Sequence, residues 1–559
     1  MDREKSNFII NAIEEDNHNH VYSDNRVHTR FPPEPNGYLH IGHAKASLLN
    51  YRIAKRYNGV FNLRFDDTNP EKEDLEYVDS IQKDLEWLGI KWDENIYFAS
   101  SYFKKMIEYA KELIRKGVAY VDDQDSETIH RMRGNLKTPG TASPYRNRSI
   151  DENMNLFQDM IDGKVSEGAK VLRAKIDMSS SNMNLRDPVI YRVRHEIQPI
   201  SGEEWYVYPM YDFAHPVEDA IEGITHSLCT LEFEDHRPIY NWYLEHLDEF
   251  KNEPPRQIEF AKLNLDQTII GKRYLKKLVD EGIVDGWDDP RMVTICGLRR
   301  RGYTPKAIRD FCEEIGVAKA NSTVNYGMLE HFVRNDLKLQ ASRMNVVLDP
   351  LKVTITNYPK DQTEWLDIET NQDVPEMGHH KMPFGREIYV ERSDFMEVPP
   401  RKYFRLFPGN EVRLRGAYFI KCNEFVKDNT GNVVELKCTY DPETKCGSGF
   451  TGRKVKGTIH WVSIPEGKSV EVHMLKPLLK DNSGFTMDNL LEKINPDSLK
   501  VVHAVAEPEV LKAKPFEKVQ FIRNGYFSVD PKYSSSGHPV FNLVVPLKSS
   551  WRPPKNKNK

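Results

Sequence analysis

Apolar runs and helical periodicity alternate over the first hundred residues. Residues 27–31 suit a short strand, and residues 59–67 read as a buried one. From Gly42 onward, apolar positions recur at spacings of three and four, which predicts a helix between these strands. A second helix is predicted over residues 73–88, and we expect its apolar stripe in the core: Val78, Ile81, Leu85 and Leu88. The pattern therefore predicts a βαβ unit.

The periodicity changes further along the chain. Residues 102–116 predict a helix, and the region up to about 210 is rich in turn residues and basic side chains, as in an insertion. Helices are expected from 274 to about 338, one of them beginning at 286–292 and ending at 298–305. From about 339 short alternating strands dominate. Representative strands are predicted at 171–176 and 189–193 in the insertion, and at 386–390, 411–414, 458–462 and 470–474 in the β-rich part.

Composition narrows the class of protein. The 559 residues are enough for several domains, and a charged fraction of 29% with a net charge of -5 confines any nucleic-acid surface to a local patch. Six cysteines without a CxxC pair argue against zinc and against a disulfide framework, and they suit a reducing cytoplasm. We find no apolar run near the ~20 residues of a membrane span and no targeting signal. At the N-terminus, residues 8–13 predict a docked helix before a loose linker.

One turn carries the strongest chemical signal. Residues 30–46 read Arg-Phe-Pro-Pro-Glu-Pro-Asn-Gly-Tyr-Leu-His-Ile-Gly-His-Ala-Lys-Ala, a strand, a proline-rich turn and a helix start. Free N–H groups and the helix dipole favour phosphate there, and Gly42 permits close backbone approach. His40 and His43 can donate hydrogen bonds to phosphoryl oxygens. Two such histidines alone are weak evidence, and without a third ligand we expect no metal site.

The complete run resembles the HIGH motif of class I aminoacyl-tRNA synthetases, and its Pro-Pro-Glu-Pro-Asn-Gly form is similar to the glutaminyl-tRNA synthetases. The resemblance covers about residues 26–551. It implies a multidomain α/β and β protein: a Rossmann-type nucleotide-binding fold, an acceptor-stem insertion, a helical connector and two C-terminal β-barrels. The implied limits are an N-terminal arm at 1–25, the Rossmann domain at 26–99 and 211–260, the insertion at 100–210, the connector at 261–338, a proximal barrel at 339–355 and 470–547, a distal barrel at 356–469 and a basic tail at 548–559.

The resemblance also implies site residues. His40, His43 and Lys272 are the expected catalytic residues, because they stabilise charge on the triphosphate. ATP is expected to contact Glu34, Pro35, Asn36, His40, Ile41, Gly42, His43, Ala44, Lys45, Ala46, Thr230, Lys262, Leu263, Ile270, Gly271 and Lys272. Glutamine is expected to contact Arg30, Asp66, Tyr211, Cys229 and Gln257. Asp66 lies at the carboxyl end of a predicted strand, where ligands bind in open α/β sheets. The alternative for its neighbours Asp67 and Thr68 is turn and cap chemistry.

Cys229 is the residue that best distinguishes glutamine from glutamate as the expected substrate. Glutamyl enzymes similar to this chain carry an arginine there, which would pair with a γ-carboxylate, whereas a neutral thiol leaves room for an amide. An unpaired carboxylate in an amide site would cost several kcal/mol. The resemblance therefore favours glutamine as substrate.

The second motif departs from the family pattern. The run Ile269-Ile270-Gly271-Lys272-Arg273 resembles the KMSKS loop, but Ile270-Gly271 replaces Met-Ser and Lys262 replaces an arginine. Glycine removes a hydroxyl donor and loosens the loop, and lysine loses the planar fork. We expect slower activation or weaker ATP binding.

For RNA, the resemblance implies a contact of Asp235 with the first acceptor base pairs. It implies anticodon contacts of Arg343, Lys402, Arg405, Arg415, Gln520 and Arg523. Lys402 and Phe404 depart from the expected pattern, which leaves the reading of one base open. A run of three arginines, residues 299–301, either faces RNA or is a solvated helix end.

These features predict ATP-dependent attachment of glutamine to its tRNA through glutaminyl-adenylate, with Mg²⁺ bound to ATP. We expect a cytoplasmic monomer whose partners are tRNA(Gln), glutamine and ATP. Two alternatives stay open: a glutamyl or nondiscriminating enzyme of the same architecture, and a synthetase-like RNA-binding protein without catalysis, which only the altered loop favours.

Overall fold

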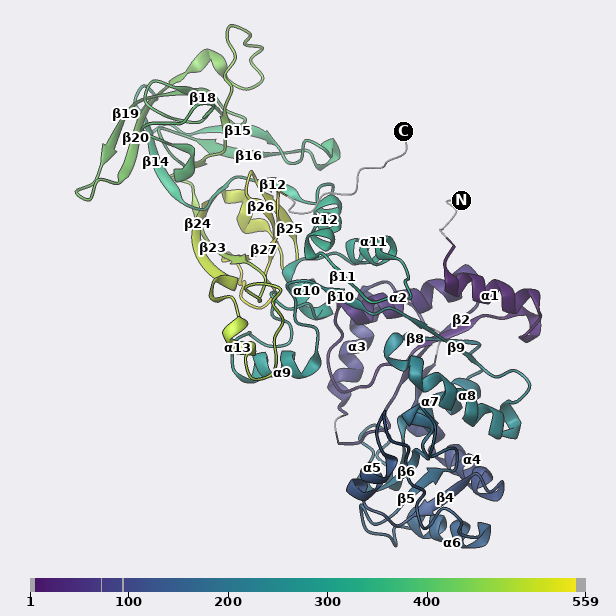
Figure 1. Cartoon of the computed structure of the whole chain (residues 1–559). Coiled ribbons are helices and arrows are strands. Elements are labelled where there is room, and N and C mark those ends of the chain that lie inside the picture. The colour runs from purple at the N-terminus through teal and green to yellow at the C-terminus, as the bar shows by residue number, and fades with distance from the viewer. Residues whose placement is uncertain (1–5, 72, 93–94, 549–559) are drawn as a thin grey trace. The chain divides into compact units, whose positions relative to one another are not determined.

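The computed structural model describes residues 6–71, 73–92 and 95–548, which form two compact units (Figure 1). The first unit holds the chain up to Asn264 together with residues 312–323, and the second holds 265–311 and the chain from Val324 onward. Most of the predicted basic tail, at 549–559, and the first five residues of the predicted arm lie outside the described residues. The predicted domain limits remain predictions.

A parallel sheet organises the first unit. Strands β1 (His28–Phe31), β2 (Val60–Phe65) and β3 (Ile96–Phe98) pair in that order, and β8 (His226–Thr230) pairs with β9 (Arg256–Phe260). The two sets adjoin, since the Thr225 N–H donates to the His28 carbonyl at 3.0 Å. The chain order therefore reverses between β1 and β8, and in open α/β sheets ligands bind at such a point.

Helices cover this sheet as the periodicity predicted. Helix α2 (Ile41–Arg56) follows β1, and α3 (Leu75–Trp87) follows β2 with its four predicted stripe residues buried. Helix α1 (Phe8–His18) begins at Asn7, whose side chain accepts from the N–H groups of Ile9 and Ile10. Its isoleucines pack in one core with Ile53 and Leu228, so the predicted docking of this helix is confirmed.

The insertion contributes a separate antiparallel sheet to the first unit. Its strands are β4 (Ala119–Asp122), β5 (Val171–Ala174), β6 (Val189–Ile197) and β7 (Glu204–Pro209), paired in chain order. Helices α4 (Phe103–Arg115), α6 (Ile150–Ile161), α7 (Tyr211–Ile221) and α8 (Arg237–His246) share one hydrophobic core with these strands. This core fixes the insertion to the chain segment that leads into β8.

The second unit corrects one predicted helix. Residues 286–293 form turns, and α10 begins later, at Ile295, with Thr294 as its N-cap. The Asp289 carboxylate explains the late start, because it accepts from the Asp285 and Arg291 N–H groups and holds the chain in a turn. Other helices here are α9 (Lys272–Asp280) and α12 (Tyr326–Leu337).

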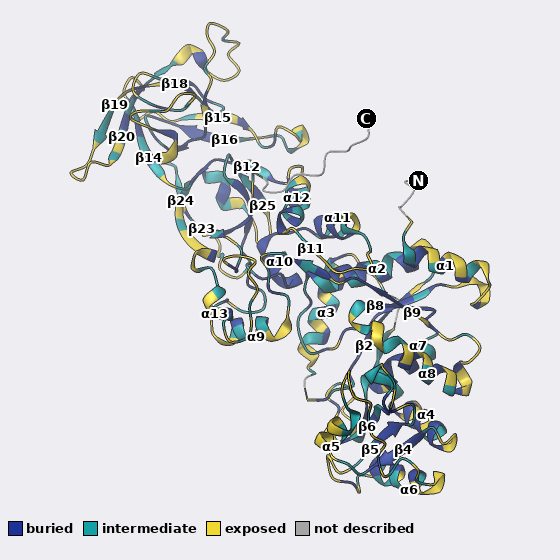
Figure 2. Cartoon of the chain, viewed as in Figure 1, coloured by how far each residue is buried: buried dark blue, intermediate teal, exposed yellow. Residues whose placement is uncertain are grey.

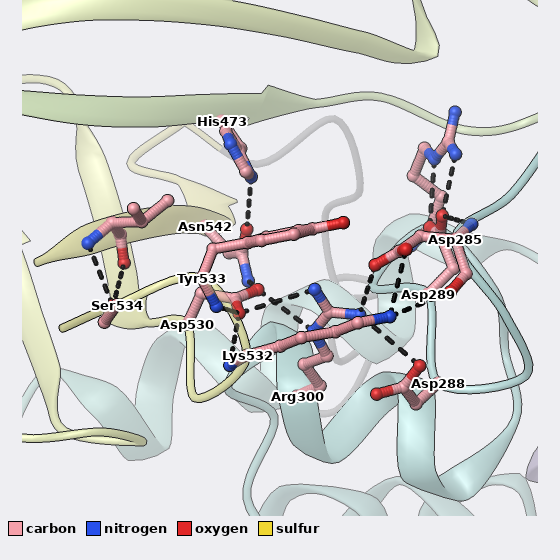
Figure 3. Close-up of polar contacts among 12 residues, drawn as sticks. Asp285, Asp288, Asp289, Arg300, His473, Asp530, Lys532, Tyr533, Ser534 and Asn542 are labelled. Carbon is pink, nitrogen blue, oxygen red and sulfur yellow. Dashed lines mark hydrogen bonds and ion pairs between the residues drawn. The ribbon is translucent and has the colours of Figure 1, made fainter.

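The arginines that end α10 (Ile295–Arg301) are not a solvated surface. Arg300 and Arg301 are 2% and 3% exposed. Arg300 donates to Asp530 and Asp285 at 3.0 Å, with the aspartates converging on it (Figure 3). Arg301 donates to the Leu543 and Val544 carbonyls at 3.2 Å. These two arginines therefore bind α10 to the β-rich part of the unit instead of facing RNA.

Two seven-stranded sheets form the rest of the second unit. One has the order β12-β25-β26-β27-β23-β24-β13, from β12 (Ser342–Met344) to β27 (Val540–Pro546), and the other has the order β21-β18-β19-β20-β14-β17-β22. Each closes around its own buried cluster, and the buried residues follow the strands while the connecting loops are exposed (Figure 2). Together with the parallel sheet of the first unit, they confirm the predicted multidomain fold class.

In the described part of the chain, no helix is long and apolar enough to cross a membrane.

Candidate active site and RNA-binding residues

The two histidines of the turn shape the start of α2. His40 is the N-cap, and its Nδ1 accepts from the Gly42 N–H at 3.1 Å, while His43 Nδ1 accepts from the His40 N–H at 3.2 Å. The rings stack with centroids 3.8 Å apart. Since both Nδ1 atoms accept, the proton of each neutral ring sits on Nε2. Gly42 leaves room for this arrangement, because a Cβ there would lie 2.9 Å from the His40 ring and the ring would have to shift.

Burial keeps both rings neutral. It lowers the pKa of His43 to about 4, and burial together with the His43 ring holds the pKa of His40 well below its usual value. Neutral Nε2–H groups at a helix N-terminus are hydrogen-bond donors that add no positive charge of their own. This arrangement suits phosphoryl oxygens, which also gain from the helix dipole.

Asp66 ends β2 in a group of carboxylates. It is 7% exposed and accepts from the Thr68 hydroxyl at 2.9 Å. Burial, and then the nearby Glu34 charge, raises the pKa of Asp66 to about 6. Burial raises the pKa of Glu73 to about 8. Asp67 instead accepts from the Ser100 N–H and hydroxyl at 2.8 and 2.6 Å, so it serves the fold. The group attracts a cation such as an α-ammonium.

Asp66 gives a pH prediction. Its folded pKa of about 6 lies above the ordinary 3.8, so the folded state loses stability as pH rises from 3.8 to about 6; the cost is full above 6 and absent below 3.8. Ammonium binding needs the carboxylate, so we expect kcat/KM for the amino acid to fall about tenfold per pH unit below 6. Glu34→Gln removes one charge and should move this inflection to lower pH. A pH profile of kcat/KM with an inflection unmoved by Glu34→Gln would contradict the assignment.

Arg30 lies behind the site in a buried network. It is 1% exposed and donates to Asp219 Oδ1 at 2.8 Å, to the Leu228 carbonyl at 3.1 Å and to Ser227 Oγ at 2.8 Å. Arg64 also donates to Asp219, at 2.8 Å. The Arg30 guanidinium is thus engaged with β8, and its expected contact with glutamine stays a prediction that this geometry does not favour.

Tyr211, Cys229 and Gln257 lie near the reversal of strand order. The Tyr211 hydroxyl is 3.0 Å from His215 Nδ1, and burial raises the pKa of Tyr211 well above its usual value. Burial likewise raises the pKa of Cys229, so the thiol is neutral. The Gln257 amide donates to the Phe233 carbonyl at 3.0 Å and to Glu259 at 2.9 Å. Cys229 and Glu259 are opposite one another in the β8–β9 pair. Two cations act near Cys229, but each already has a carboxylate partner: Arg30 pairs with Asp219 and Arg237 pairs with Glu259, both at 2.8 Å. Neither is left over for a γ-carboxylate, which suits an amide better.

The remaining expected ATP residues of the first unit differ in exposure. The Lys45 ammonium is buried and donates to the Ala261 carbonyl at 2.9 Å, so it holds α2 against the segment after β9. The Lys262 side chain pairs with Glu232 at 2.6 Å near the surface. Ile41, Ala44, Pro35 and Leu263 are buried, Thr230, Asn36 and Ala46 are half-buried, and Glu34 is exposed. Their contacts with ATP remain predictions.

The altered second motif opens a helix in the second unit. Gly271 is the N-cap of α9 and forms no side-chain cap, and Lys272 is the first helical residue, with its side chain exposed. A Cβ at Gly271 would lie 2.8 Å from the Tyr274 ring, which therefore has to shift for any larger residue. Ile270 precedes this turn.

Gly271→Ser tests the cost of the altered loop. A serine hydroxyl can donate to a phosphoryl oxygen, and a hydrogen bond of about 1 kcal/mol corresponds to about fivefold. We expect a rise in kcat or a fall in the ATP KM of that size. Gly271→Ala is the matched control, since it meets the same Tyr274 ring without a hydroxyl. A serine variant with unchanged kcat and unchanged ATP KM would contradict the prediction.

Three of the expected RNA residues, Arg343, Arg405 and Arg523, pair with two acidic side chains of the second unit, whereas Asp235 is exposed in the first unit. Arg523 donates to Asp394 through both terminal nitrogens at 2.6 Å, and Arg405 reaches the same carboxylate at 3.2 Å. Arg343 pairs with Asp373. Arg343 also lies opposite Gln520 in the β12–β25 register. Burial lowers the pKa of half-buried Arg415, and the positive charge of Arg343 lowers it further. Lys402 is exposed, with φ of 70°.

Sequence reasoning missed the acceptors that orient these arginines. Asp394 is fully buried, 129 residues before its partner Arg523 in the chain. Glu73, whose pKa burial raises to about 8, was expected only as a helix start. A single acidic residue in a loop carries no sequence signal of such a role, because its partner is distant along the chain.

The comparisons with known proteins agree with this geometry. Residues 26–339 match the tRNA synthetases class I (E and Q), catalytic domain, and residues 341–441 and 458–530 match the anti-codon binding domains of the same group. The chain belongs to the class I (E and Q) tRNA synthetases. It is 57% identical over 98% of both chains to a glutamine–tRNA ligase of Clostridium perfringens. It is 56% identical to those of Clostridium kluyveri, over 99% of both chains, and Clostridioides difficile, over 98%.

Proposed function

We propose that this class I synthetase is a glutamine–tRNA ligase. The observation that carries the proposal is the identity of 56–57% to enzymes of that name over almost the full length of both chains. The neutral Cys229 thiol supports glutamine over glutamate, because the cations near it, Arg30 and Arg237, are already paired with Asp219 and Glu259 and a buried γ-carboxylate would compete for them. The nearer alternative, a glutamyl enzyme, is therefore not favoured.

The reaction has two steps. A carboxylate oxygen of glutamine attacks the α-phosphorus of ATP, the new O–P bond forms, and the bond to pyrophosphate breaks. The 2′-hydroxyl of the terminal tRNA adenosine then attacks the activated carbonyl carbon, and AMP leaves. Such chemistry depends on positioning and charge stabilisation. The site therefore needs hydrogen-bond donors to the triphosphate, a carboxylate for the α-ammonium and a neutral pocket for the side-chain amide.

The residues of the chain divide these tasks. The Nε2–H groups of His40 and His43 bind phosphoryl oxygens, and the Lys272 ammonium offsets the charge that develops on pyrophosphate. Asp66 holds the α-ammonium, and Tyr211 contacts the side chain. Mg²⁺ enters with ATP, since it prefers phosphate oxygens and keeps several waters. In the described residues, no three His, Cys, Asp or Glu side chains gather to hold a metal of their own. The proposed enzyme is a monomer that acts in the cytoplasm.

Aminoacylation of a glutamine tRNA transcript tests the proposal. The assay contains ATP and Mg²⁺, with glutamine and glutamate in parallel. Charging with glutamine alone is the expected result. Charging with glutamate would make the chain a glutamyl or nondiscriminating enzyme. Binding of tRNA without charging by either amino acid would make it an RNA-binding protein, with the altered loop at Gly271 as the first residue to restore.

A further inference from the structure

Phe404 exposes an aromatic ring on a cationic loop. It is 44% exposed in the loop between the 3-10 turn at Arg392–Asp394 and strand β18 (Glu411–Leu414). The Lys456 ammonium lies 5.2 Å from the centroid of its ring. The exposed residues Arg401 and Lys402 precede it, and Arg405 follows it. The exposed ring is therefore open to contact with a flat ligand, in a loop that carries several cations.

The backbone around this ring is fixed. Gly457 packs against the Phe404 carbonyl, from which a Cβ would be only 1.8 Å away. The Tyr403 hydroxyl and the Arg405 guanidinium donate to the Ser393 carbonyl at 3.2 and 3.0 Å. These contacts on both sides of Phe404 hold its backbone in place before any ligand binds, which reduces the ordering cost of a contact.

The surrounding charges identify the kind of partner. Arg405 and Arg523 share the buried Asp394, and the Glu391 charge also acts on Arg523, so the excess of positive charge here comes from the exposed lysines. Lys402 and Lys456 add exposed ammonium groups nearby in the same loop and beside the ring. An exposed aromatic ring beside one ammonium, in a loop that carries further cations, suits a ligand with a flat π-system and phosphates, which is a single-stranded nucleotide.

We propose that the Phe404 ring stacks on one unpaired base of the tRNA anticodon loop. This inference rests on the proposed function, since it takes tRNA as the substrate, and the match of residues 341–441 to an anti-codon binding domain agrees with it. Every base has a π-face, so stacking holds the base without reading its hydrogen-bonding edge. The enzyme therefore tolerates any base at that one position, while Arg405 and Arg523 lie beside it.

Transcripts with 2-aminopurine at each anticodon-loop position in turn test the stack. One position is expected to lose fluorescence on binding, because stacking quenches 2-aminopurine. Phe404→Leu should abolish that quenching and weaken tRNA binding about tenfold, and Phe404→Trp should retain both. Phe516→Leu is the control, since Phe516 is similarly exposed, at 39%, in another loop of the same unit. All four natural bases at the quenched position should then be charged with similar kcat/KM.

The outcomes separate this inference from the proposed function. If the wild-type enzyme charges tRNA with glutamine and Phe404→Leu leaves quenching and affinity unchanged, the stacking is wrong and the function stands. If the charging of the four transcripts differs more than tenfold, the base is read by its edge and the inference also fails. If the wild type charges no tRNA, the proposed function itself fails.

Discussion

Lys272→Ala is expected to lower the rate of adenylate formation about 10²- to 10³-fold. The ammonium at the start of α9 is the proposed counter-charge for the pyrophosphate that leaves, and removing one group that stabilises charge only in the transition state costs about 3–4 kcal/mol. Because that charge grows as the α-phosphorus is attacked, kcat should fall more than the ATP KM rises. Exchange of labelled pyrophosphate into ATP, with glutamine and tRNA present, measures this step.

Two further variants serve as controls for this prediction. Lys276→Ala removes an exposed lysine one turn further along α9, whose pair with Asp280 at 2.7 Å is worth at most about 0.5 kcal/mol. Its rate should match that of the wild type. Lys272→Arg retains the charge with a different shape and should recover part of the rate. An alanine variant that changes only the ATP KM would show that Lys272 binds ATP equally in the ground and transition states, and the catalytic role would be lost.

Local sequence signals accounted for the parts of the fold that depend on neighbours in the chain. The strand, proline turn and helix around His40 appear as predicted, because prolines, glycine and helical periodicity each act within a few residues. The same holds for β18, whose limits agree with those expected, and for α3, which begins two residues later and ends one residue earlier than expected. Asp66 was placed at a strand end by the same reasoning, and it lies there.

Side-chain contacts account for what sequence reasoning could not supply, with partners both near in the chain and distant. The expected helix start at 286–292 is wrong because the Asp289 carboxylate stabilises a turn, and Asp289 and Arg291 look like ordinary helix formers near Pro290. The burial of Arg300 depends on Asp530, 230 residues later. No periodicity encodes such a pair. A run of arginines thus looks like a nucleic-acid surface until its carboxylate partners are known.

Arg300→Leu should destabilise the second unit by about 3–5 kcal/mol. Asp530 is fully buried, and Arg300 supplies its charged partner at 3.0 Å, so the variant leaves a buried carboxylate unpaired (Figure 3). Asp285 loses a partner as well. Burial raises the pKa of Asp285, but hydrogen bonds from Tyr533, Lys532 and Arg300 outweigh burial and lower this pKa to about 2. Hydrogen exchange of the β26 (Gly525–Val529) and β27 amides follows local opening and should rise at least about 100-fold.

The unpaired charge, and not the lost volume, is the expected cause. Arg300→Leu combined with Asp530→Asn neutralises the buried carboxylate, and its amide can still accept from the Lys532 and Tyr533 N–H groups, which now donate at 2.7 and 3.0 Å. The double variant should therefore recover at least half of the lost stability, as buried pairs removed together cost less than one partner removed alone. Arg299→Leu, one position earlier and half-buried, should cost less than about 1 kcal/mol. If the double variant were as unstable as Arg300→Leu alone, packing of the guanidinium over the Tyr533 ring would be the dominant contribution, and the arginine would matter for its shape more than for its charge.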